Sequence, residues 1–169
     1  IWAGTLGGVF KYDLRTRQFS MVGAEIEKRE RGSGTFSVLA MCRDAGGDLW
    51  IGTYKHGLFR VSGSLDESVR RVPFPGNPQD ERSLAVSALL PGRDRVLWVG
   101  TSRGLYAYDL ERNAFRGHFV HGPAPGSLSH DQVAVLFEDR SGRLWVGTQD
   151  GLNLLDRARG TFTVFRPAP

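Results

Sequence analysis

The chain has 169 residues, of which 40% are hydrophobic and 11% aromatic, so it can bury a core, and a disordered polypeptide is excluded. Its net charge of +4 arises from 22 basic and 18 acidic residues. The basic residues are spread along the chain and form no patch of the kind that binds phosphate backbones. We therefore expect no nucleic-acid partner.

The sequence also limits which membrane and disulfide-bonded classes the chain can belong to. No apolar stretch approaches the ~20 residues of a membrane-spanning helix, and we expect no membrane contact by this segment. Cys42 is the one cysteine, which excludes an intrachain disulfide, and its apolar surroundings predict a buried, unreactive thiol. The chain starts at Ile1 with neither an initiator Met nor a signal peptide, so we expect a segment of a longer protein.

In chain order, the first predicted element is Ile1–Thr5, with the sequence IWAGT. The motif recurs as LWIGT at Leu49–Thr53, LWVGT at Leu97–Thr101 and LWVGT at Leu144–Thr148. The four tryptophans of these segments are the only ones in the chain, and they stand 48, 48 and 47 residues apart. A fixed period of this length is the signature of a repeat fold.

Each copy continues, after a short break, into a second apolar run that a glycine opens, such as Gly104-Leu105-Tyr106. A β-rich run precedes the tryptophan in the later copies, at Val38–Cys42, Val86–Leu90 and Val133–Phe137, whereas the first copy begins too late to contain one. Each full copy therefore predicts four short strands joined by tight turns, which is the pattern of a β-propeller blade.

The predicted fold class is all-β: a β-propeller segment of four-stranded antiparallel blades, with three full blades and a partial first blade. As a single segment over residues 1–169, it divides into a partial blade at 1–22 and blades at 36–74, 84–120 and 131–166. The repeated tryptophans and glycines are interpreted as packing residues, because a small residue beside the indole lets the next blade close over the ring. These structural residues are Trp2, Trp50, Trp98, Trp145, Gly4, Gly52, Gly100 and Gly147.

The repeat carries a family resemblance. The pattern Asp-x-x-Gly-x-Leu-Trp-x-Gly-Thr from Asp139 to Thr148, followed by Gly151-Leu152, resembles the two-component regulator propeller repeat. The Ser127-Leu128 pair ahead of Val133 is similar to the lead-in of that repeat. The resemblance covers essentially the whole chain.

This resemblance implies a function. Members of the family form the periplasmic sensor domains of bacterial hybrid two-component or diguanylate cyclase receptors, and often detect carbohydrates or other small ligands. It implies a non-catalytic, extracytoplasmic ligand-sensing module without a cofactor, with the histidine kinase or diguanylate cyclase elsewhere in the parent receptor. Two alternatives stay open: a protein-interaction platform like the WD-repeat propellers, and a propeller lyase or glycoside-cleaving enzyme.

Groups that suggest catalysis or metal binding have simpler interpretations. Ser129-His130-Asp131 has the residue types of a hydrolase triad, but neighbours in sequence cannot converge as nucleophile, base and orienter. His118 and His121 stand near His130, yet we interpret them as surface loop histidines and expect no metal site. Asp44–Trp50 resembles the Asp-box of sialidase propellers, which is itself a structural turn.

The predicted ligand site lies in loops at one face of the ring. The loops between second and third strands share that face with the loops that lead to the next blade, namely Pro75 to Ser83 and His121 to Asp131, so their tips can converge. The first set includes Leu6-Gly7. Solvated turns without a binding role are the alternative. If the site exists, we expect its contacts from Tyr54, Lys55, His56, Arg103, Gln149 and Asp150.

The ends of the chain predict an association. The first blade lacks its inner strand, so the terminal blades would expose apolar faces and an unpaired strand edge. We expect these surfaces to meet other propeller blades or a second copy of the chain, and we favour an open arc or a ring of two copies over a closed four-bladed ring.

Overall fold

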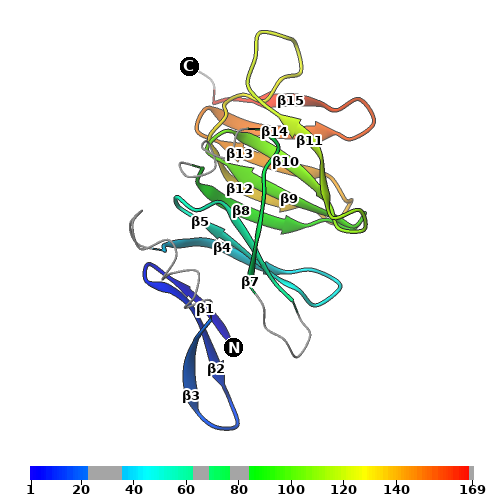
Figure 1. The fold of residues 1–169 in the computed structure, drawn as a ribbon. Coiled ribbons are helices and arrows are strands. Elements are labelled where there is room, and N and C mark those ends of the chain that lie inside the picture. The colour runs from blue at the N-terminus through cyan, green and yellow to red at the C-terminus, as the bar shows by residue number, and fades with distance from the viewer. Residues whose placement is uncertain (23–35, 63–68, 77–83, 168–169) are drawn as a thin grey trace. The chain divides into compact units, whose positions relative to one another are not determined.

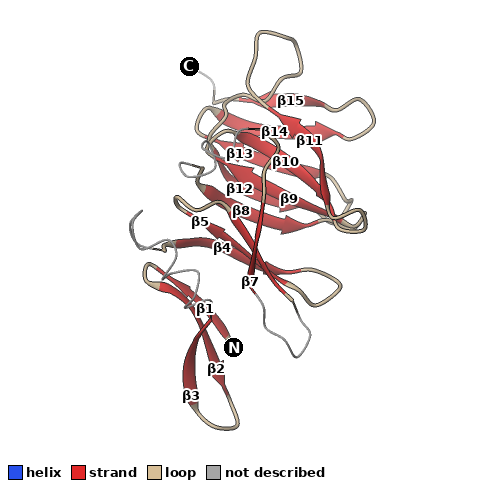
Figure 2. Ribbon diagram, viewed as in Figure 1, coloured by secondary structure: helices blue, strands red, loops and turns tan. Residues whose placement is uncertain are grey.

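The computed structural model describes residues 1–22, 36–62, 69–76 and 84–167 (Figure 1). These ranges contain fifteen strands (Figure 2), and within them no helix is long and apolar enough to cross a membrane. The strands form one three-stranded and three four-stranded antiparallel sheets, each taken up in chain order. The predicted all-β fold class, with one partial and three full blades, is confirmed.

The chain divides into two compact units, and the first spans residues 1–86. It holds two sheets, with the orders β1-β2-β3 and β4-β5-β6-β7. The strands of the first sheet are β1 (Trp2–Thr5), β2 (Gly8–Asp13) and β3 (Gln18–Val22). Those of the second are β4 (Val38–Arg43), β5 (Leu49–Thr53), β6 (Leu58–Val61) and β7 (Val69–Val72).

The second unit spans residues 87–169, and its two sheets run β8 to β11 and β12 to β15. The third sheet is built of β8 (Val86–Pro91), β9 (Val96–Thr101), β10 (Gly104–Asp109) and β11 (Ala114–Phe119). The fourth is built of β12 (Val133–Glu138), β13 (Leu144–Thr148), β14 (Gly151–Asp156) and β15 (Thr161–Phe165).

The repeated threonine and glycine form one hairpin in every copy. In the third sheet, Thr101 Oγ1 donates to the carbonyl of Gly104 at 2.8 Å and accepts the backbone N–H of Arg103 at 2.9 Å. Gly104 has φ of 106°, a region that side chains disfavour. The same threonine-to-glycine bond forms in the other copies, at Thr5–Gly8, Thr53–Gly57 and Thr148–Gly151.

The turn after the third strand explains the recurrent aspartate. Asp109 Oδ1 accepts the backbone N–H groups of Glu111 and Arg112, both at 2.9 Å, and Asn113 then adopts a left-handed conformation with φ of 52°. A short acceptor that caps its own turn is what this geometry requires. Asp13 and Asp156 make the same turn in the first and fourth sheets.

Neighbouring sheets within a unit pack through the motif glycine. A Cβ on Gly4 would lie 2.6 Å from Val38 Cγ1, and a Cβ on Gly100 would lie 2.6 Å from Val133 Cγ1. In both cases the valine belongs to the first strand of the next sheet. The glycine therefore admits the following blade, as the sequence predicted, and a larger side chain would collide with it.

The core of the second unit lies between its two sheets. Trp98 packs there with Leu144, Val146 and Phe162 of the fourth sheet. By contrast, β12 leaves large apolar side chains on the surface, since Val135 is 57% and Phe137 61% exposed. The inner strand of the last blade is thus apolar but only partly buried.

Candidate functional site

In the first unit, two of the predicted loops meet at Ser37. Ser37 Oγ donates to the carbonyl of Leu6 at 3.3 Å, and the backbone N–H of Tyr54 donates to the carbonyl of Ser37 at 2.9 Å. Tyr54 is 52% exposed, and the ammonium of Lys55 lies 5.3 Å from the centre of its ring. The unit therefore presents an exposed phenol with a cation beside it.

His56 differs from the expectation of a contact residue at a loop tip. Its side chain is only 1% exposed, and its ring stacks on Phe36 at 5.6 Å with an interplanar angle of 20°. The loop from Tyr54 to His56 has one residue more than the matching Ser102-Arg103 and Gln149-Asp150, and the additional residue turns inward. In this structure a ligand at the loop tip does not reach its ring.

In the second unit, the remaining predicted residues lie in two loops, one between β9 and β10 and one between β13 and β14. The backbone N–H of Gly104 donates to the carbonyl of Asp131 at 2.7 Å, and that of Gln149 donates to the carbonyl of Gln132 at 3.1 Å. Asp150 forms an ion pair with Arg166 at 2.9 Å. The two loops therefore both adjoin the segment leading into β12. The loop Pro75 to Ser83 lies outside the described residues beyond position 76.

The histidines and the triad-like segment have structural contacts. His118 stacks on Tyr106 at 3.9 Å and lies in β11. Its interpretation as a loop histidine is wrong, because β11 is still paired with β10 at this position, where His118 stands opposite Tyr106. Ser129 Oγ bonds to Thr148 Oγ1 at 2.7 Å, and His130 Nδ1 accepts the N–H of Gln132. Among the described residues there is no group of three His, Cys, Asp or Glu that could hold a metal.

A carboxylate holds the indole N–H in two blades. In the turn before β5, Asp44 Oδ2 accepts Trp50 Nε1–H at 2.7 Å. In the turn before β13, Asp139 Oδ2 accepts Trp145 Nε1–H at 3.1 Å. Hydrogen bonds from the backbone N–H of Arg143 and then from this indole lower the pKa of Asp139 to about 2. The Asp-box-like segment is thus a turn that anchors a tryptophan.

The third blade departs from this arrangement. Six residues before Trp98 stands Gly92, and the buried Nε1 of Trp98 has no hydrogen-bond partner among the described residues. A cavity of about 270 Å³ lies over this indole, between the two sheets of the second unit. We call it the Trp98 pocket. Its walls include Trp98, Phe119 and Leu155.

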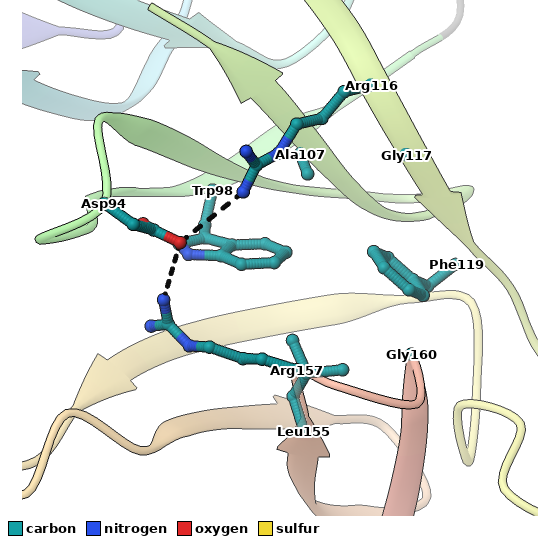
Figure 3. Close-up of a pocket in the computed structure, with 9 residues that line it drawn as sticks. All are labelled: Asp94, Trp98, Ala107, Arg116, Gly117, Phe119, Leu155, Arg157 and Gly160. Atoms are coloured by element: carbon teal, nitrogen blue, oxygen red, sulfur yellow. Dashed lines mark hydrogen bonds and ion pairs between the residues drawn. The ribbon is translucent and has the colours of Figure 1, made fainter.

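Figure 3 shows three charged side chains at the Nε1 end of the indole. Asp94 pairs with Arg157 at 2.8 Å and with Arg116 at 3.4 Å. Sequence reasoning missed this pocket because it treated the four copies as equivalent; a position-by-position comparison shows that Gly92 replaces the aspartate of the other turns. The predicted Arg103, Gln149 and Asp150 do not line it.

The fold and these turns define a segment of β-propeller blades. The family described as Two component regulator propeller matches residues 32–55 and 127–150, which are the stretches leading into and through the tryptophan hairpins of the second and fourth copies. The match confirms the predicted resemblance: these two stretches of the chain are similar to two component regulator propeller repeats. None of the curated proteins matches the chain.

Solved structures share the fold. The extracellular domain of a hybrid two component system from B. thetaiotaomicron has a TM-score of 0.76 at 21% identity, covering 98% of this chain and 20% of that chain. The same domain of a second hybrid system from that organism has a TM-score of 0.78 at 22% identity, covering 99% and 21%. The chain thus spans about a fifth of the length of these proteins.

A propeller enzyme is also similar. A catalytically inactive virginiamycin B lyase from Staphylococcus aureus has a TM-score of 0.65 at 13% identity, covering 97% of this chain and 50% of the lyase. At such identities the likeness to each of these structures shows the fold alone.

Proposed function

We propose that this segment forms part of the extracytoplasmic, ligand-sensing propeller of a bacterial two-component signalling receptor, and that it is not itself catalytic. The observation that carries the proposal is the pair of regulator propeller repeats matched at residues 32–55 and 127–150. The shared fold with extracellular domains of hybrid two component systems supports it. A periplasmic location follows from the same argument.

The proposed recognition surface is formed by the loops after the tryptophan strands. Tyr54 supports this role because an exposed aromatic ring stacks on the apolar face of a sugar or on a peptide. Lys55, Arg103, Gln149 and Asp150 would add directional polar contacts. The hairpin threonines hold these loops rigidly through hydrogen bonds, so the side chains are positioned before a ligand arrives.

The test uses the complete receptor and the carbohydrate or small molecule that activates it. The double variant Tyr54→Ala/Arg103→Ala should bind that molecule at least tenfold more weakly in calorimetry, while its melting temperature stays within about 2 °C of the parent. The control variant Phe137→Ala/Arg112→Ala removes an exposed aromatic and an exposed arginine outside these loops, and should bind normally. Unchanged affinity in the first variant would refute the surface.

A propeller lyase is the second candidate, favoured by the likeness to virginiamycin B lyase. It requires acid and base groups that meet on one face of the ring. A protein-interaction platform would instead bind a peptide or partner domain. Turnover of a substrate by the complete protein, or capture of a peptide with no small-molecule binding, would decide for one of these over the sensor.

A further inference from the structure

The repeats provide an internal reference for what surrounds each indole. On the neighbouring strand, Lys11 stands opposite Trp2, Arg60 opposite Trp50 and Leu154 opposite Trp145. Opposite Trp98 stands Ala107. Lys11 and Arg60 lie over their indole rings at 5.6 Å and 5.2 Å. In the third blade the partner strand therefore places only a methyl group beside the ring, and the cation over the ring comes instead from Arg157 of the fourth sheet.

The indole N–H of Trp98 lacks the carboxylate acceptor of the other blades, although the turn before its strand has the same backbone hydrogen bond. The backbone N–H of Gly92 donates to the carbonyl of Val96 at 2.7 Å, and the matching bond from Asp44 to Asp48 measures 3.0 Å. Gly92 thus occupies the backbone place of Asp44 without its carboxylate. Trp98 is only 3% exposed, and a buried donor is ordinarily paired.

Strand β11, the outer strand of this sheet, also leaves space beside the Trp98 indole. The pairing of β10 with β11 shifts register between Ala107 and Tyr108, which pair with Gly117 and Phe115. Arg116 is the additional residue at this bulge, and bulges re-aim side chains. Gly117 then faces Ala107, where Thr163 faces Leu154 in the fourth blade. Three positions around the Trp98 indole therefore hold small residues, namely Gly92, Ala107 and Gly117.

Charged and apolar groups divide the cavity into two ends. The guanidinium of Arg157 lies 5.6 Å from the centre of the Trp98 ring and pairs with Asp94 and Glu138, each at 2.8 Å. Arg116 reaches Asp94 at 3.4 Å and stays nearly half exposed. At the other end, Phe119 and Leu155 offer apolar contact (Figure 3).

We propose that the Trp98 pocket binds a small molecule with a carboxylate on an apolar ring. The carboxylate would accept the N–H of Trp98, as Asp44 and Asp139 do for their indoles, and would take a second bond from Arg116. The ring would lie over the indole and against Phe119 and Leu155. A cavity of about 270 Å³ suits a single ring, since the pockets that bind drug-sized ligands measure roughly 300–1,000 Å³.

This site goes beyond the proposed sensing surface, because none of the predicted loop residues lines it and its occupancy needs no signalling partner. Binding at the Trp98 pocket is measured on the 169-residue chain itself. Loss of the sensing function in a complete receptor therefore leaves this inference standing, and failure here leaves the proposed function standing.

The experiment follows the four indole N–H signals in a ¹⁵N-correlation spectrum while benzoate is added. Trp98→Phe assigns the signal of Trp98. Benzoate should shift that signal alone, in a saturable way, and neutral benzamide should bind at least tenfold more weakly. Gly92→Asp restores the carboxylate of the other blades and should abolish the shift. Its Cβ would meet Asp94 Oδ1 at 2.9 Å, Trp98 Nε1 at 3.1 Å and the backbone oxygen of Val96 at 3.2 Å. The exposed Asp94 side chain can move aside, and the other two contacts require shifts of a few tenths of an ångström.

A second variant tests the same site in case Gly92→Asp does not fold. Ala107→Leu places beside the indole the residue that the fourth blade uses there, and should also abolish the shift. Gly122→Ala, at a position that does not line the pocket, should keep it. Signals from the other indoles report that each variant is folded. The inference is overturned if benzoate does not shift the Trp98 signal, if benzamide binds equally well, or if all four signals move together. It is also overturned if Asp94→Asn, without benzoate, moves the Trp98 signal as the loss of a hydrogen-bond acceptor would.

Discussion

Replacing Gly100 with alanine tests the packing of one blade on the next. The new Cβ would lie 2.6 Å from Val133 Cγ1 and 3.2 Å from Ala88 Cβ. Val133 is 2% exposed and β-branched, so it has no free rotamer into which to withdraw. Such overpacking costs about 1–3 kcal/mol, which for a chain of this size lowers the melting temperature by roughly 2–12 °C.

The assay is urea unfolding of Gly100→Ala, Val133→Ala and the double variant. Val133→Ala alone should cost at least about 1.6 kcal/mol for its two lost carbon atoms. In the double variant the added methyl occupies the space that Val133 vacates, so the loss should fall short of the sum by about 1 kcal/mol. Gly122→Ala, whose Cβ would meet nothing closer than Ser127 Oγ at 3.5 Å, is the control. Strict additivity would refute the contact.

Three further predictions concern single groups. Trp50→Phe should lower the free energy of unfolding by about 1.5–3 kcal/mol more than Trp98→Phe, since only Trp50 gives up a bond to a carboxylate; equal losses would contradict this. Desolvation of the half-buried Cys42 thiol raises its pKa from 9.0 to about 12, so the folded thiol should react slowly with a disulfide reagent at pH 8. The free energy of unfolding should fall from pH 9 to 12, because the unfolded thiol ionises first. The pKa of Asp139 is lowered to about 2, so its carboxylate stabilises the fold above pH 3.8, and this stabilisation is lost as the pH falls toward 2. In Asp139→Asn, urea midpoints measured between pH 2 and 5 should no longer show this contribution to the pH dependence.

The repeat made the blades predictable. Each Trp-x-Gly-Thr segment constrains its surroundings twice, through the hairpin that Thr101 closes on Gly104 and through the glycine that admits Val133. Because these constraints are local or recur at one period, they are visible in the residue order. Strand positions and the all-β class therefore followed from the sequence.

The candidate sites depended on contacts that residue order does not show. His56 is buried because Phe36, twenty positions away in the sequence, stacks on its ring. The Trp98 pocket needs the register shift in β11 and an arginine from the following blade. Gly92 and Ala107 were visible as departures from the repeat, but their meaning depends on which indole each one faces.

The central claim, an extracytoplasmic sensor, requires that these blades lie outside the cytoplasm. Arg112 offers a direct measurement, because its side chain is 82% exposed in a turn. In the complete protein carrying Cys42→Ser and Arg112→Cys, a membrane-impermeant maleimide should label intact spheroplasts as fully as lysed ones. Labelling that appears only after lysis would place the blades in the cytoplasm and contradict the account.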